Sequence, residues 1–119
     1  MEPARSFPKT RRLARTAEYE RVKQNGPTQR GKLLMLSALP VENSGLCRAG
    51  FVTSRHLGKA VVRNRIRRRL REIVRQHQQQ LRQDFWIVVI ARSAAANATY
   101  RELEHEWLRL AKRASILAP

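Results

Sequence analysis

Cysteine, aspartate and long apolar runs are scarce in this sequence, and each shortage excludes a class of protein. The single Cys47 excludes a disulfide within the chain and a zinc site built from several cysteines, and it fits a reducing compartment. The longest apolar runs, Leu33–Leu36 and Phe85–Ala91, fall far short of the ~20 residues of a membrane helix. Residues 1–15 carry charge and proline but no apolar core, so we expect no signal peptide. We therefore expect a cytoplasmic protein that does not contact membranes.

Acidic residues are also scarce, at 9 against 25 lysines and arginines, for a formal net charge of +16. A two-metal nuclease needs several carboxylates around ions about 4 Å apart, whereas the only aspartate, Asp84, starts an apolar segment typical of a buried strand. Glu102, His105 and Glu106 share one face of a predicted helix, but acids in a first helical turn are the ordinary complement of the helix dipole. We therefore expect no catalytic residue and no metal site in the chain itself.

Arginine is the residue present in excess, at 20 of the 25 basic residues. Its planar guanidinium binds phosphate with two hydrogen bonds and stacks on bases, so RNA or DNA is the expected partner. The apolar content of 42% is too high for a disordered basic tail, and 119 residues correspond to one domain. We expect a flexible basic arm over residues 1–15 and a single nucleic-acid-binding domain over residues 16–117.

Three helices and three strands are predicted from the spacing of apolar residues and from the turn residues between them. The first two strands flank the turn-rich segment 40–45, so we expect them to pair as a hairpin. The third is almost entirely apolar, as in a strand buried on both faces. The order is α-β-β-α-β-α, which becomes α-β-β-β-α-β-α if residues 28–32 add a short strand. The expected elements are a helix over 17–25, strands over 33–39 and 47–55, a helix over 60–83, a strand over 85–91 and a final helix from Thr99.

Two threonines are expected to start helices. Thr16 precedes the first helix, where its hydroxyl can accept a main-chain N–H, and Thr99 is followed three residues later by Glu102, the pattern of a capping box.

The long predicted helix separates apolar from basic residues. At 100° per residue its apolar side chains fall within a stripe of about 120°. Seven arginines lie between residues 61 and 75 and are offset by the single Glu72, and five of them fall opposite the stripe with Asn64: Arg65, Arg67, Arg68, Arg71 and Arg75. A charged helix face is usually just solvated, but unpaired like charges at helical spacing destabilise a helix, so this one-sided run favours polyanion binding. The apolar stripe is Val62, Ile66, Leu70, Ile73, Val74, His77 and Leu81.

The segment Gly58–Glu72, together with Arg48–Arg55 before it, closely resembles the signature of the bacterial ribonuclease P protein subunit. The resemblance extends to Glu18–Val22 and Asp84–Arg92. Its most specific part is the Arg-Asn-Arg segment with the Gly-Lys-Ala before it and the second arginine cluster after it.

The resemblance covers roughly residues 11 to 113 and implies both a fold and a function. In that family a small protein binds a large catalytic RNA, and the complex removes the 5′ leader of precursor tRNA by hydrolysis that depends on Mg²⁺, bound mainly by the RNA. The implied fold is α+β, an α/β sandwich with a small central sheet, packed helices and a left-handed crossover, which is against the usual hand. The implied enzyme is an endoribonuclease whose catalytic centre lies in the RNA subunit, and the protein alone is expected to be monomeric.

Two sets of binding residues follow by position from the resemblance. The set facing the RNA subunit is Arg63, Asn64, Arg65, Arg67, Arg68 and Arg71. The set lining a cleft for the single-stranded leader, between the first helix and the sheet, is Tyr19, Lys23, Met35, Ser37, Val52, Ser54 and Arg55. Aromatic residues are common in the family at the positions of Lys23 and Ser37. Stacking is worth about 1–3 kcal/mol per base, so we expect this chain to depend more on phosphate contacts from Lys23 and Arg55.

Two other classes share parts of this pattern. A ribosomal or other structural RNA-binding protein has the same charge, size and arginine helix, and differs in leaving precursor tRNA cleavage unchanged. A DNA-binding or membrane-active amphipathic protein is disfavoured, because the basic helix has no helix-turn-helix partner and its apolar stripe matches further core elements.

Overall fold

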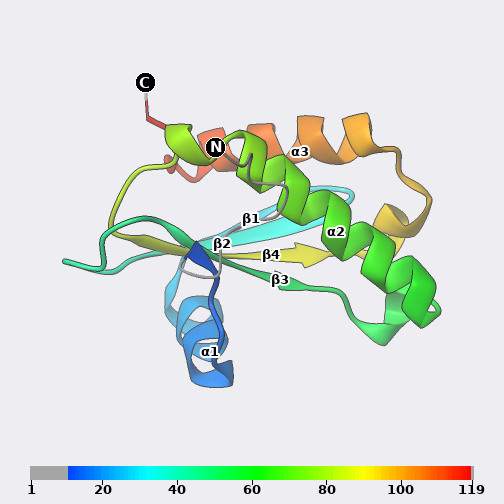
Figure 1. The fold of residues 1–119 in the computed structure, drawn as a ribbon, viewed down its shortest axis with the longest axis horizontal. Helices are drawn as coiled ribbons and strands as arrows, with labels where there is room; N and C mark the ends of the chain where they lie inside the picture. The colour runs from blue at the N-terminus through cyan, green and yellow to red at the C-terminus, as the bar shows by residue number, and fades with distance from the viewer. Residues whose placement is uncertain (1–10, 119) are drawn as a thin grey trace, which may run out of the picture.

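The fold of residues 11–118, the part of the chain that the computed structural model describes, is a four-stranded sheet with three helices (Figure 1). The order α-β-β-β-α-β-α is confirmed, including the short strand expected within residues 28–32. The elements are α1 (Thr16–Asn25), β1 (Thr28–Arg30), β2 (Leu34–Pro40), β3 (Arg48–Val52), α2 (Ala60–Gln76), β4 (Phe85–Ala91) and α3 (Tyr100–Arg113).

The strand order in the sheet is β1-β2-β4-β3. β4 pairs antiparallel with β2 and parallel with β3, so the hairpin predicted between β2 and β3 is wrong. The reason lies in β4, whose Ile87, Val88 and Val89 are fully buried, because a strand that is apolar on both faces is favoured in the centre of the sheet. The tight hairpin is the one between β1 and β2, and α2 connects the parallel pair β3 and β4.

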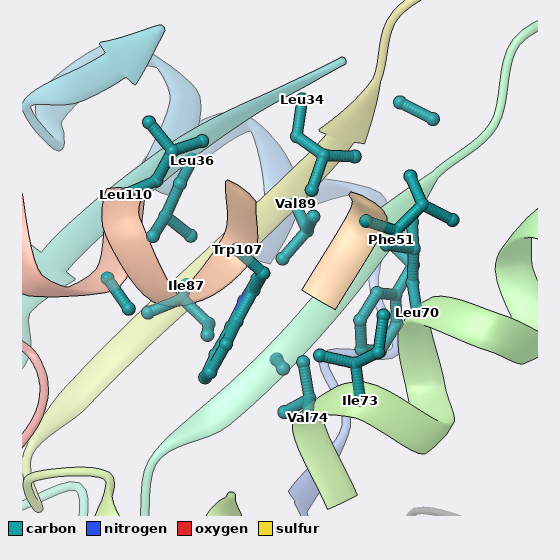
Figure 2. Close-up of a cluster of buried hydrophobic side chains, with 14 of the residues drawn as sticks. Leu34, Leu36, Phe51, Leu70, Ile73, Val74, Ile87, Val89, Trp107 and Leu110 are labelled. Atoms are coloured by element: carbon teal, nitrogen blue, oxygen red, sulfur yellow. The ribbon is translucent and has the colours of Figure 1, made fainter. Parts of the chain in front are cut away.

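The two faces of the sheet are covered by different helices. Figure 1 shows α2 and α3 on one face and α1 on the other. The larger core lies under α2 and α3, where Trp107 packs among Ile87, Val89 and the α2 residues Leu70 and Ile73 (Figure 2). The smaller core under α1 consists of Leu13, Val22 and Val88.

The long helix ends at Gln76, seven residues before the predicted end. After His77 the chain turns and then pairs with the C-terminal segment: the main-chain N–H of Arg82 donates to the carbonyl of Ile116 at 2.8 Å. This pairing buries Ile116 and Leu81 in the main core. Local helical periodicity carries no information about a partner that lies so far along the chain.

The caps of α1 and α3 differ. The capping box of α3 is confirmed, since the N–H of Thr99 donates to Glu102 Oε1 at 2.8 Å and the N–H of Glu102 donates to Thr99 Oγ1 at 3.1 Å. The prediction for α1 is wrong, because Thr16 is already helical and Arg15 occupies the cap position. There Glu18 Oε1 accepts the main-chain N–H of Arg15 at 3.0 Å.

The expected N-terminal arm is packed where the structure describes it. Residues 1–10 of that prediction lie outside the described residues. From residue 11 onward the chain contacts the domain: Leu13 is 4% exposed and its N–H donates to the carbonyl of Ala49 at 2.9 Å, while Arg11 donates to Gln78 Oε1 at 3.0 Å. The packed chain therefore begins at least five residues before the predicted boundary at residue 16.

Candidate nucleic-acid interface

Two arginines of α2 hold the helix against the segment that follows β4. Arg65 and Arg69 lie one turn apart, and each donates from its guanidinium to a main-chain carbonyl, of Ala96 and Ala98 respectively, at 3.1 Å. A guanidinium has five N–H donors, so one such bond leaves others for a ligand. Arg65, placed by the sequence among RNA contacts, therefore also supports the fold.

A second group of arginines extends from α2 toward α1. Arg67 donates to the hydroxyl of Thr53 and lies 3.4 Å from Asn64 Oδ1. Burial lowers the pKa of Arg71, and the positive charges of Arg12 and Arg67 nearby lower it further. We call Arg12, Arg67 and Arg71 the cationic cluster. Like charges held this close raise the free energy of the folded protein, and a bound anion would relieve that cost.

Negative charge on α2 is confined to one ion pair. Arg75 Nε donates to Glu72 Oε1 at 3.0 Å, and this bond lowers the pKa of Glu72. Within residues 11–118, none of the six α2 residues expected to bind RNA forms an ion pair. Among them Asn64 and Arg68 are exposed. We call Arg63, Asn64, Arg65, Arg67, Arg68 and Arg71 the α2 face.

The strand register brings several predicted cleft residues to the face of the sheet under α1. Met35 pairs with Ile90 and Val52 pairs with the same Ile90, so these three side chains form one row across the sheet. In the next row Ser37 and Gly50 both pair with Val88.

Tyr19 of α1 lies directly over Gly50. Its hydroxyl accepts the main-chain N–H of Phe51 at 3.3 Å, and a Cβ added at Gly50 would lie 2.5 Å from its ring carbons. A glycine at this position therefore allows the ring to approach the sheet. Tyr19, Met35, Ser37 and Val52 lie on one side of the molecule as expected, but Ser37 is only 2% exposed and its hydroxyl lies 2.8 Å from that of Thr28. Ser37 thus forms the floor of this region.

The three remaining residues of the predicted cleft are exposed. Lys23 follows Tyr19 by one helical turn, so both project from the same side of α1. Ser54 and Arg55 follow the end of β3 and are separated from Val52 by the buried Thr53. We call Tyr19, Lys23, Met35, Val52, Ser54 and Arg55, with Ser37 beneath them, the α1 cleft.

Some residues of this region were not predicted from the sequence to belong to a binding site. Arg12 belongs to the cationic cluster, and Arg30 pairs in register with Met35 and therefore shares its face. Trp86 lies on the same face, with the guanidinium carbons of Arg21 and Arg48 at 5.3 and 5.4 Å from its ring centroid. Trp86 and Val88 are two residues apart in β4 and therefore share a face, so the sequence could have predicted the position of Trp86. The positions of Arg12 and Arg30 depend on strand register, which the sequence does not show.

The acidic and nucleophilic groups are used within the fold. In the part of the chain that the structure describes, no group of three or more His, Cys, Asp or Glu is arranged to hold a metal ion. Glu102 caps α3, and Glu106 accepts the main-chain N–H of Leu34 at 2.7 Å. Burial raises the pKa of Cys47 to about 12, so its thiol stays protonated at neutral pH. No helix within residues 11–118 is long and apolar enough to cross a membrane.

Comparison with known proteins identifies the family. The family model described as "Ribonuclease P" matches residues 7–115. The chain belongs to the ribonuclease P protein family. The ribonuclease P protein component of Roseiflexus castenholzii is 41% identical over 107 residues, covering 89% of this chain and 87% of the relative. That of Syntrophomonas wolfei is 34% identical over 111 residues, covering 92% of each.

Solved structures of the ribonuclease P protein have the same fold. The Staphylococcus aureus structure superposes with a TM-score of 0.84 at 25% identity, covering 90% of this chain and 97% of that one. The Thermotoga maritima structure superposes with a TM-score of 0.77 at 25% identity, covering 86% of this chain and 96% of that one. The chain is thus a protein component of ribonuclease P, an endoribonuclease that processes the 5′ ends of tRNAs, and its partner is the RNA subunit of that ribonucleoprotein.

Proposed function

We propose that the α2 face and the cationic cluster bind the RNA subunit of ribonuclease P. The observation that carries this proposal is the set of arginines on α2 that no carboxylate neutralises within residues 11–118. Phosphate groups supply the missing negative charge, and each contact releases counterions from the RNA. Arg65 and Arg67 use some of their donors within the protein, which holds their guanidinium groups in place for this contact.

We propose that the α1 cleft binds the single-stranded 5′ leader of precursor tRNA. Tyr19 supplies a ring for stacking, while Lys23 and Arg55 supply exposed charges for leader phosphates. The cationic cluster adjoins this cleft, because Arg67 donates to the hydroxyl of Thr53, the residue that follows Val52. One protein can thereby hold the RNA subunit and the leader side by side.

We propose that Mg²⁺ is held by the RNA and that the catalytic centre lies there. The carboxylates of α3 do not fit a magnesium site, since Glu102 accepts hydrogen bonds at its own helix start, Glu104 lies 3.0 Å from His77 Nε2, and Glu106 accepts main-chain N–H groups. Substituting Glu102→Gln and His105→Gln should leave the cleavage rate at saturating Mg²⁺ near that of the wild type. A cleavage rate reduced by more than about a hundredfold, which is an increase of roughly 2.7 kcal/mol in the activation free energy, would contradict this assignment.

The decisive experiment is reconstitution of the full-length protein with the ribonuclease P RNA of the same organism at low Mg²⁺, followed by cleavage of a precursor tRNA. We expect the protein to accelerate cleavage. We also propose that it is monomeric before it binds the RNA and that it acts in the cytoplasm. Arg68→Gln should weaken this effect, and Arg68→Lys, which keeps the charge, should retain most of it. A protein that leaves cleavage unchanged and co-sediments with a ribosomal subunit would favour a structural RNA-binding role instead.

A further inference from the structure

A second row of basic residues lies on α3. Arg101, His105, Arg109 and Lys112 are all exposed, and at 100° per residue they fall within an arc of about 80°. This arc is opposite the buried side of the helix, which carries Leu103, Trp107 and Leu110. We call these four residues the α3 stripe.

The three acids of α3 lie beside the stripe, and each has a hydrogen-bond partner within the protein. Glu102 is bound at the helix start, and Glu104 lies 3.0 Å from His77 Nε2. Glu106 accepts the N–H groups of Leu33 and Leu34 and also the Nη2 of Arg109 at 3.0 Å. Each carboxylate of α3 is therefore held by a hydrogen bond, while the stripe carries the exposed positive charges of Arg101, Arg109 and Lys112.

Most of the stripe has no internal partner. Within residues 11–118, the side chains of Arg101, His105 and Lys112 make no hydrogen bond or ion pair, whereas the side chain of Arg109 donates to Glu106. A hollow lies between α3 and the turn from β1 to β2. It is lined on the strand side by Lys32 and Leu33, and on the helix side by three stripe residues and by the three acids Glu102, Glu104 and Glu106.

The α3 stripe is separate from the surfaces already described. α3 packs over β1 and β2, whereas α2 packs on β3. Since the sheet order is β1-β2-β4-β3, the two helices lie toward opposite edges of the sheet. α2 and α3 cover the same face of the sheet, and the α3 stripe lies toward its β1 edge whereas the α2 face lies toward its β3 edge (Figure 1).

We infer that the α3 stripe is a second phosphate-binding surface, which contacts a double-stranded segment of the RNA subunit. The stripe runs from Arg101 to Lys112, about 17 Å of straight helix, with cations about one turn apart. It holds no Phe, Tyr or Trp, which single-stranded binding surfaces use for stacking, so the contact is to the backbone and independent of sequence. This inference rests on the proposed function only in taking ribonuclease P RNA as the ligand.

The test is binding of the full-length protein to ribonuclease P RNA over a range of salt concentrations. The variant Arg101→Gln/Lys112→Gln removes two charges that have no partner within residues 11–118, so its melting temperature should be unchanged. We expect the slope of log K against log salt to fall by about 1.4–1.8, at roughly 0.7–0.9 for each phosphate that the variant no longer neutralises. The matched control Arg101→Lys/Lys112→Arg should keep the wild-type slope.

Footprinting of the RNA backbone adds a spatial readout. The α3 double variant should lose protection of a duplex segment that Arg68→Gln leaves protected. An unchanged salt slope, a loss at the same nucleotides as Arg68→Gln, or a loss confined to precursor tRNA affinity would overturn the inference. If Arg68→Gln weakens RNA binding while the α3 variant does not, the proposed function stands and only the α3 contact is wrong. Failure of the wild-type protein to bind the RNA would refute both.

Discussion

The ring of Tyr19 and the α-carbon of Gly50 are so close that one methyl group at residue 50 displaces the ring. A Cβ at Gly50 would lie 2.5 Å from Tyr19 Cε2 and Cζ and 2.8 Å from its hydroxyl oxygen, well inside van der Waals contact. β3 is held in the sheet by its pairing with β4, so the side chain moves rather than the strand. We predict that Gly50→Ala removes the stacking surface of the α1 cleft.

The expected size of the effect follows from the value of one stacked base. Losing about 1–3 kcal/mol weakens binding of precursor tRNA about 5- to 150-fold. Tyr19→Ala should produce a loss of the same size. Tyr19→Phe keeps the ring and gives up only the 3.3 Å bond from the N–H of Phe51, so its affinity should change less than about twofold.

Combining the substitutions separates displacement of the ring from damage to the sheet. Gly50→Ala/Tyr19→Ala should bind precursor tRNA no more weakly than Tyr19→Ala alone, because the added methyl group then meets no ring. The assay is equilibrium binding of the reconstituted holoenzyme to precursor and mature tRNA. Mature tRNA has no leader, so its affinity should be unchanged in every variant. Equal losses for both tRNAs, or additive losses in the double variant, would refute the reasoning.

Stability, RNA affinity and pH dependence provide further tests. Glu106→Gln should lower the free energy of unfolding by about 1.5–3 kcal/mol, because a neutral amide replaces the carboxylate that accepts two main-chain N–H groups at the start of β2; a loss below about 0.5 kcal/mol in urea unfolding would contradict this. Arg68→Gln should reduce the salt slope for RNA binding by about 0.7–0.9 without changing the melting temperature, and an unchanged slope would remove Arg68 from the interface. Hydrogen bonds from the N–H and hydroxyl of Thr99 lower the pKa of Glu102 below 4.5, so its stabilising contribution is complete above pH 4.5 and is lost as the pH falls through the folded-state value. Glu102→Gln should flatten that acidic part of the stability curve, and an unaltered curve would argue against the cap.

The amino-acid sequence by itself determined the elements and the family. The stripe of Ile66, Leu70 and Ile73 predicts α2, and the apolar run of β4 predicts a strand buried on both faces, because these properties depend on neighbours within a few residues. The α3 cap is likewise a bond between residues three positions apart. The Arg-Asn-Arg segment was sufficient to predict the family, since it is a local pattern.

The tertiary structure alone decided which distant groups meet. It placed β4 between β2 and β3, ended α2 where the C-terminal segment pairs with the chain, and brought Arg12 to Arg71. Each of these results depends on pairing between segments far apart in sequence, where one residue of strand register changes which side chains share a face. The tertiary structure also decided which arginines donate to main-chain carbonyls within the fold and which keep their N–H groups on the surface. Arg65 can donate to the carbonyl of Ala96 only after folding brings that carbonyl to α2.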